Sequence, residues 1–87
     1  MTASTFKPPH STPEAIKDSV IDLREYLAEL FWTVGVQSEI GERSAALADD
    51  ALVEIATQRL VMAVRQIHST VIQLQEMKAL RKKEGAR

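Results

Sequence analysis

Hydrophobic positions in the first third of the chain recur at alternating steps of four and three residues. The series comprises Ile16, Val20, Leu23, Leu27, Leu30 and Val34. Four acidic residues lie between these positions: Asp18, Asp22, Glu25 and Glu29. Such spacing places one apolar stripe along a helix and the charges on its other faces. A stripe this regular is typical of helices that pack as coiled coils.

A second series with the same steps follows in the last third of the chain. It comprises Leu60, Val64, Ile67, Val71 and Leu74. Two helices with such stripes pack against each other or against copies of themselves. The sequence therefore predicts an all-α fold, an antiparallel helical hairpin in which these five residues provide self-association.

Capping signals predict where the helices begin and end. Thr12-Pro13-Glu14 is typical of a helix start, with Thr12 as N-cap and Pro13 in the first turn. Gly35 is expected to end this helix, because a glycine after the last turn adopts the left-handed conformation readily. We expect Ser38 to cap one long second helix over residues 38–83. In the alternative, Asp49-Asp50 is a further N-cap that splits this segment into a short helix and a long one.

The same signals divide the chain into three parts. Residues 1–12 are expected to form an N-terminal tail, residues 13–84 the helical hairpin domain, and residues 85–87 a C-terminal tail. Phe6 is the only large apolar residue of the first tail after Met1 and is its candidate anchor to the domain. The alternative is an undocked leader.

The expected helix lengths predict a homodimer. A second helix about twice as long as the first is covered only along its front half, which leaves the stripe from Leu60 to Leu74 bare. Residues 51–64 are apolar around most of the helix, so they require neighbours on more than one side. With 87 residues and no cysteine, the chain has a small core and no disulfide to reinforce it. We therefore expect two hairpins to form a four-helix bundle.

The formal net charge of −1 conceals an uneven distribution. From Pro13 to Glu54 there are three basic and ten acidic residues, whereas from Ile55 to Arg87 there are seven basic and two acidic residues. This polarity favours an antiparallel hairpin or an antiparallel dimer, in which acidic segments lie beside basic ones. The alternative is that water solvates both segments, since exposed pairs contribute only about 0.2–1 kcal/mol each.

No residue pattern points to a metal, a cofactor or a catalytic site. The chain has two histidines and no cysteine, and the turn-spaced neighbours of His68 are Arg65 and Ile72, which are not metal ligands. With three glycines in all, there is no glycine-rich phosphate loop. We therefore expect a non-enzymatic protein without cofactors.

One segment carries a resemblance to an enzyme family. Ile21-Asp22-Leu23-Arg24 resembles the opening of the long first helix of small all-helical chorismate mutases. The resemblance implies a mutase-type enzyme with a cluster of buried cations that holds two carboxylates. The candidates here would be Arg24, Arg43, Arg59 and Arg65. The lysines expected further along the first helix are missing, so this is the less favoured function.

The favoured function is protein–protein interaction. The build is similar to that of small dimeric helical anti-activators, regulatory proteins that sequester transcription factors. Tyr26, Phe31 and Trp32 are the candidate partner-binding residues, because large aromatic side chains are the preferred anchors at interfaces. Neither a signal peptide nor a transmembrane run of about 20 apolar residues is visible, so the expected location is cytoplasmic, without a membrane partner.

The alternative function is that of a DNA-associated regulator. Its candidate nucleic-acid contacts are the cations near the C-terminus: Lys78, Arg81, Lys82 and Lys83. Such residues bind phosphates, but they also stabilise a helix C-terminus. Because the sequence pI is about 6.1 and no aromatic residue lies among these cations, nucleic acid is the less favoured partner.

Overall fold

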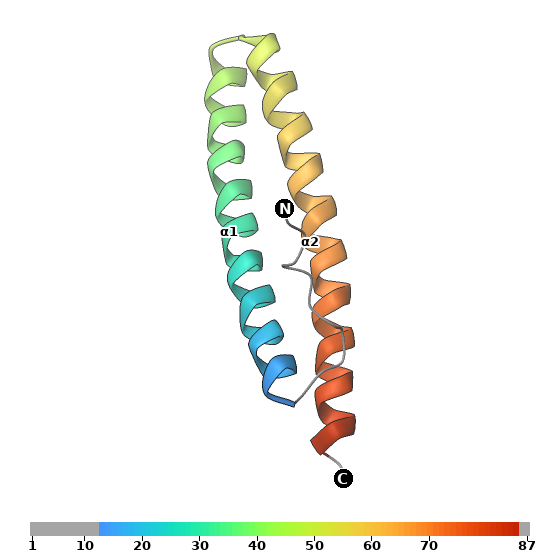
Figure 1. The fold of residues 1–87 in the computed structure, drawn as a ribbon. Helices are drawn as coiled ribbons and strands as arrows, with labels where there is room; N and C mark the ends of the chain where they lie inside the picture. Colours follow the sequence, from blue (N-terminus) through green and yellow to red (C-terminus); the bar gives the residue numbers. More distant parts are fainter. Residues whose placement is uncertain (1–12, 86–87) are drawn as a thin grey trace, which may run out of the picture.

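The structure is a computed structural model that describes residues 13–85. Its two elements are the α-helices α1 (Pro13–Ala46) and α2 (Asp50–Gly85), which lie antiparallel and side by side (Figure 1). The predicted all-α hairpin is therefore confirmed. The expected N-terminal tail, with Phe6 and the cap Thr12, lies outside the described residues. Gly85, expected in the C-terminal tail, is the last residue of α2.

The predicted helix boundaries inside the chain are wrong. Gly35 and Ser38 lie within α1, which spans 34 residues, and α2 spans 36 residues. Among the described glycines none has a positive φ, so Gly35 does not form a left-handed cap. A glycine inside a helix lowers its stability without ending it. Because the two helices are nearly equal in length, the expected uncovered half of the second helix does not exist.

The turn between the helices is built on Ala48 and Asp49. Ala48 has a φ of 58°, and its N–H donates to the carbonyl of Ala45 at 3.1 Å. The N–H of Asp49 donates to the carbonyl of Ser44 at 2.8 Å, which completes a Schellman ending for α1. The Asp49 carboxylate then accepts a hydrogen bond from the N–H of Leu52 at 3.1 Å. Asp49 is thus the N-cap of α2, as in the alternative boundary prediction.

One seam of side chains runs between the helices along their whole length. On α1 it consists of Val20, Leu23, Leu27, Leu30, Val34, Gln37, Gly41 and Ser44, all buried or half-buried. On α2 it consists of Val53, Ala56, Leu60, Ala63, Ile67, Thr70, Leu74 and Met77. The four-three spacing therefore continues beyond Val34, through small and polar residues that conceal it in the sequence.

Small residues bring the helices close together near the turn. A Cβ atom added at Gly41 would lie 3.6 Å from the Cβ of Ala56, an ordinary van der Waals distance. Val20, Ala56 and Ala63 are the apolar residues that are fully buried within residues 13–85. The seam is consequently narrow, and many large apolar side chains of both helices lie outside it.

The predicted self-association stripe is divided by this arrangement. Leu60, Ile67 and Leu74 are half-buried in the seam against α1. The positions between them in the seam are Ala63 and Thr70, whereas Val64 and Val71 lie one residue further around the helix. Val64 is exposed and Val71 is half-buried, so this side of α2 borders the seam and extends from it to the surface.

Candidate functional site

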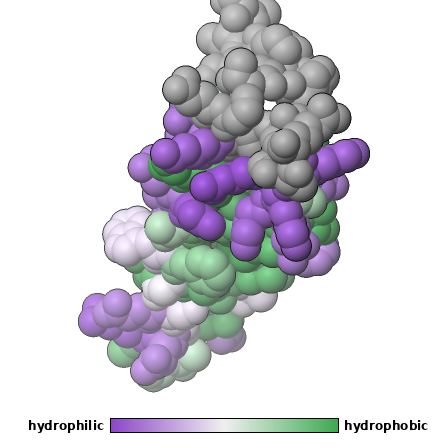
Figure 2. Space-filling view, turned by 90° about the horizontal axis from the view of Figure 1, so that it is seen from below, coloured by the Kyte–Doolittle hydropathy of each residue, from purple (hydrophilic) through white to green (hydrophobic). Residues whose placement is uncertain are grey.

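Many large hydrophobic side chains stay at the surface of the hairpin. Those with marked exposure are Ile21, Tyr26, Phe31, Trp32, Ile40, Leu47, Leu52, Ile55, Val61, Met62, Val64 and Ile72. Figure 2, which views the molecule from the end opposite the turn, shows hydrophobic residues at the surface beside hydrophilic ones. Two helices cover only one face of each other, so this surface has no cover within the hairpin. Extensive exposed apolar surface is typical of interaction sites.

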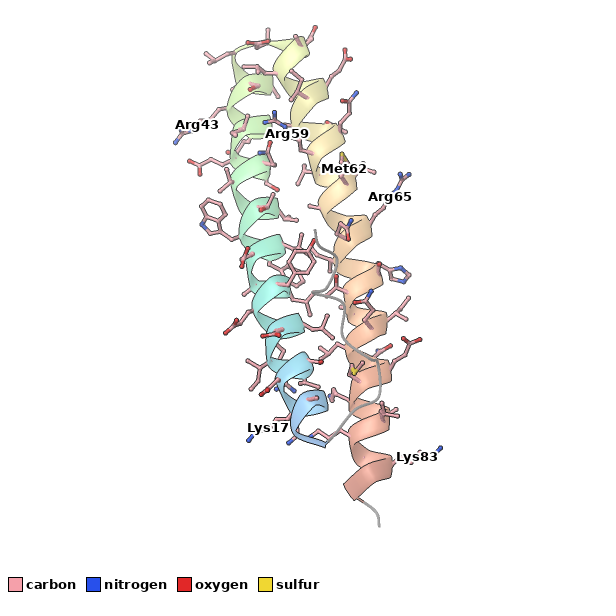
Figure 3. The ribbon with its side chains drawn as sticks, viewed as in Figure 1. Lys17, Arg43, Arg59, Met62, Arg65 and Lys83 are labelled. Carbon is pink, nitrogen blue, oxygen red and sulfur yellow. The ribbon has the colours of Figure 1, made fainter. Side chains whose placement is uncertain are left out.

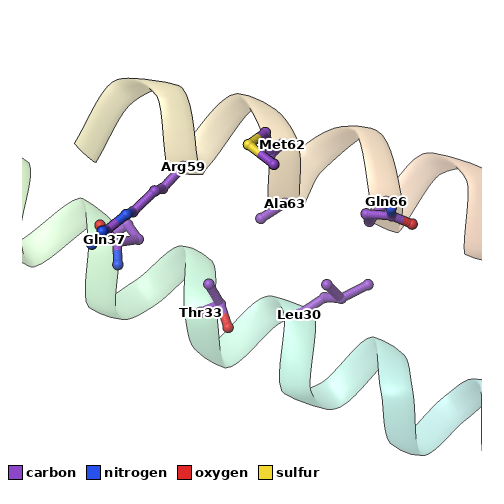
Figure 4. Close-up of a pocket in the computed structure, with 7 residues that line it drawn as sticks. All are labelled: Leu30, Thr33, Gln37, Arg59, Met62, Ala63 and Gln66. Carbon is purple, nitrogen blue, oxygen red and sulfur yellow. The ribbon is translucent and has the colours of Figure 1, made fainter. Parts of the chain in front are cut away.

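The first candidate surface is a shallow groove along one side of the hairpin, with a volume of about 260 Å³. It is lined by Leu30, Thr33 and Gln37 from α1 and by Arg59, Met62, Ala63 and Gln66 from α2 (Figure 4). The Arg59 side chain extends from α2 toward Gln37. The Oε1 atom of Gln37 is buried and has no hydrogen-bond partner. Met62, which is 65% exposed, adds a flexible apolar contact to this side.

The second candidate surface lies on the opposite side, which we call the Phe31 flank. Phe31 follows the groove residue Leu30 and Val64 follows the groove residue Ala63, so each points to the other side of its helix. Phe31 is 59% exposed and Val64 is 54% exposed. Residues at multiples of seven from Phe31, Gly35, Val61 or Val64 lie on the same side. The apolar ones are Ile21, Ala28, Phe31, Gly35, Ala45, Val61, Val64 and Val71.

The three predicted partner-binding aromatics lie on three different faces. Tyr26 precedes Thr33 by seven residues and so lies on the groove side of α1. Phe31 belongs to the Phe31 flank. Trp32 is 71% exposed and lies on the outer face of α1, away from α2. No single partner surface therefore combines all three aromatic side chains.

Acidic residues form a stripe on the outer face of α1. Its members are Asp18, Asp22, Glu25 and Glu29, all exposed, and Trp32 follows them on the same face. Carboxylates three or four residues apart on a helix repel one another. Further along α1, Arg43 Nη2 and Glu39 Oε1 form an exposed ion pair at 2.7 Å.

The basic residues proposed for nucleic-acid contact are exposed near the end of α2. Lys78, Arg81 and Lys82, together with Ala79, line a hollow of about 450 Å³. Lys83 points away from the hairpin (Figure 3). These cations are thus accessible to an anionic partner, although they also lie at the helix C-terminus that cations stabilise.

The four arginines named from the mutase resemblance are spread over the hairpin. Arg43 and Arg65 point outward on opposite sides, and Arg59 lies between the helices (Figure 3). Arg24 is exposed on α1. These side chains do not converge on one buried site. Within residues 13–85, no three His, Asp or Glu side chains gather as a metal site would require, and neither helix is long and apolar enough to span a bilayer.

The sequence did not predict Gln37 and Met62 as site residues, and it offered Arg59 only through the mutase resemblance. None of them belongs to a periodic apolar series, so only the position of the turn brings them together. Placing the turn at Asp49 instead of Gly35 would have aligned them across the two helices.

No protein-family model, curated protein sequence or solved structure matches this chain. Its functional interpretation therefore depends on the geometry and chemistry of the two surfaces.

Proposed function

We propose that this protein is a small non-enzymatic interaction module of the regulatory or anti-activator type, which sequesters a protein partner as a homodimer. The observation that carries the proposal is the distribution of apolar side chains. Among the described residues few apolar side chains are fully buried, whereas large ones such as Phe31 and Met62 are exposed on both sides of the hairpin.

In a homodimer, the second copy buries the apolar side chains on one of the two sides of the hairpin. Two hairpins packed side to side form a four-helix bundle, in which each helix has two neighbours instead of one. Burying a valine or phenylalanine side chain contributes about 1.5–3 kcal/mol. Such gains are large for a domain of this size, which has little core of its own.

The groove side then remains for the partner. Its apolar lining suits an amphipathic helix that inserts apolar side chains between Leu30 and Met62. Arg59 offers a cation for a partner carboxylate. Tyr26 and Trp32, on the adjoining faces of α1, extend this surface.

The alternative proposal, a DNA-associated regulator, is supported by the exposed cations Lys78, Arg81 and Lys82. Phosphate binding by such residues weakens steeply as salt rises. A gel shift with duplex DNA at low and at high salt tests it. Absence of any shift at low salt would remove this alternative.

The main proposal is tested by affinity capture from the native host, with light scattering on the same samples. We expect a mass near twice 9.7 kDa and a specifically captured protein. Met62→Asp should abolish capture without changing the mass, because it places a charge in the groove. Ile72→Asp, an exposed apolar position on the outer face of α2, is the matched control and should retain capture. Equal capture by both variants would contradict the groove as the partner site.

A further inference from the structure

We propose that a second copy of this chain docks on the Phe31 flank, and that the two copies run antiparallel, with the turn of one beside the open end of the other. This inference rests on the homodimer proposed above. It adds the face through which the copies meet and their relative direction.

The centre of the Phe31 flank is apolar on both helices at the same level. Gly41 lies against Ala56. Phe31 precedes Gly41 by ten residues and Val64 follows Ala56 by eight, so the two exposed side chains lie across from each other. The groove side has Arg59, Gln37 and Gln66 at the corresponding level, and a second copy there would remove these polar groups from water. On the Phe31 flank, the same seven-residue spacing gives His68 as the polar side chain nearest this level, so burying this flank removes fewer polar groups from water.

Small residues on either side of Phe31 leave room for another helix. Ala28 and Gly35 lie one turn before and one turn after Phe31 on α1. A Cβ atom at Gly35 would meet nothing within 4 Å, and the backbone there does not require glycine, since its φ is not positive. Within the hairpin alone, alanine at this position would be more stable. Close passage of a second α1 beside Gly35 gives the glycine a structural role.

Charge along this flank selects the antiparallel direction. Residues that lie multiples of seven from Phe31, Gly35, Val61 or Val64 share the flank. Among the described side chains, those at the turn end are acidic: Glu42, Asp50 and Glu54. Those toward the open end are basic: Lys17, Arg24, Lys78 and Lys82. A parallel dimer would place acidic groups on acidic groups, whereas an antiparallel dimer places acidic groups on basic ones.

The match extends to individual pairs. With the two-fold axis beside Phe31, each Phe31 ring faces its own counterpart. Counting outward from that axis, Glu54 lies level with Lys78 of the second copy, and Asp50 lies level with Lys82. Glu54 and Lys78 are 24 residues apart on one straight helix, about 36 Å, so they cannot pair within a single hairpin.

Sedimentation equilibrium of the full chain tests the face. Val64→Gln should raise the dimer dissociation constant about tenfold or more, because each dimer loses two buried valines. Ile72→Gln, on the outer face of α2, should leave the constant unchanged. Circular dichroism should show the same helix content in both variants. Equal dimerisation of the two variants would overturn the assignment of the face.

Charge reversal tests the direction. Glu54→Lys should weaken the antiparallel dimer roughly two- to tenfold, and adding Lys78→Glu should restore it, since exposed pairs have effects of this size. In a parallel dimer Glu54 would lie near Glu42 of the second copy, so Glu54→Lys would strengthen the dimer. Strengthening, or failure of the double variant to recover, would overturn the antiparallel direction.

The distance between spin labels on the two copies tests their relative direction independently. The chain has no cysteine, so Leu47→Cys at the turn, where Leu47 is 81% exposed, provides one spin-label site. The antiparallel dimer predicts labels about 48 Å apart, twice the rise from Phe31 to the turn. A parallel dimer predicts labels within about 20 Å, because neighbouring helix axes are 8–10 Å apart. A wild-type monomer would overturn the proposed homodimer as well, whereas a dimer with the short distance would overturn only this inference.

Discussion

At the scale of single residues, the turn depends on Ala48 and Asp49. Asp49 serves both helices, since its N–H donates to Ser44 of α1 and its side chain accepts from Leu52 of α2. Ala48 occupies a left-handed conformation that glycine normally provides at this place. An L-residue with a Cβ atom is strained there by about 1–2 kcal/mol. The hairpin therefore forms this turn although Ala48 is strained in it.

Ala48→Gly is accordingly expected to stabilise the hairpin. The relief of the left-handed strain outweighs the extra freedom of glycine in the unfolded chain, and the net gain should be roughly 0.5–1 kcal/mol. Urea unfolding followed by circular dichroism measures it. Ala45→Gly, in the last turn of α1, is the control and should lower the free energy of unfolding. A loss of stability in both variants would contradict the role given to Ala48.

At the scale of the elements, each helix presents an exposed outer face and three further surfaces. The seam holds the hairpin together, and its α2 side alternates large residues such as Leu60 and Ile67 with small ones such as Ala63. The groove and the Phe31 flank lie to either side. Because a helix turns by about 100° per residue, neighbouring positions such as Ala63 and Val64 belong to different surfaces. Substitutions at neighbouring positions should therefore have different consequences.

Ile67→Asp should unfold the hairpin. Ile67 is half-buried in the seam, where an uncompensated carboxylate costs several kcal/mol. Loss of the helical circular dichroism signal at 25 °C is the expected result. Ile72→Asp, five residues away on the exposed outer face, should keep the helix content. If Ile67→Asp retains both the helix content and the melting temperature, Ile67 does not pack in the seam.

At the scale of the whole molecule, two helices do not enclose a core. Only one face of each is covered, and the fully buried residues in the described part of the chain are a valine, two alanines, a serine and a threonine. The apolar side chains that would form the core of a larger domain instead lie on the surface. In the proposed homodimer, the second copy covers part of this surface and thereby stabilises the fold.

The melting temperature should consequently depend on protein concentration. Folding coupled to dimerisation is favoured at high concentration by mass action. We expect the transition midpoint to rise by several degrees when the chain concentration is raised about a hundredfold, from about 2 to about 200 µM. Differential scanning calorimetry measures this rise. A midpoint that does not change with concentration would contradict the proposed homodimer.

The sequence by itself determined that the chain is helical and forms a hairpin. The four-three spacing from Val20 to Val34 depends only on local periodicity, and the structure bears it out. The N-cap at Asp49 was visible as one of two alternatives. The composition of the α2 seam was not, because positions 60, 64, 67, 71 and 74 and positions 60, 63, 67, 70 and 74 both alternate steps of four and three. Only the packing shows that Ala63 and Thr70 complete the seam in place of Val64 and Val71.

The tertiary structure decided where the turn lies and which side chains face each other. Gly35 carries a helix-ending signal, but the covered seam continues through Gln37, Gly41 and Ser44, and packing against α2 favours the longer helix. That choice aligned Arg59 with Gln37 in the groove and Phe31 with Val64 on the opposite flank. Local preferences of a fraction of a kilocalorie per residue fix helix formation, whereas only the summed packing of two whole helices fixes their ends and their facing surfaces.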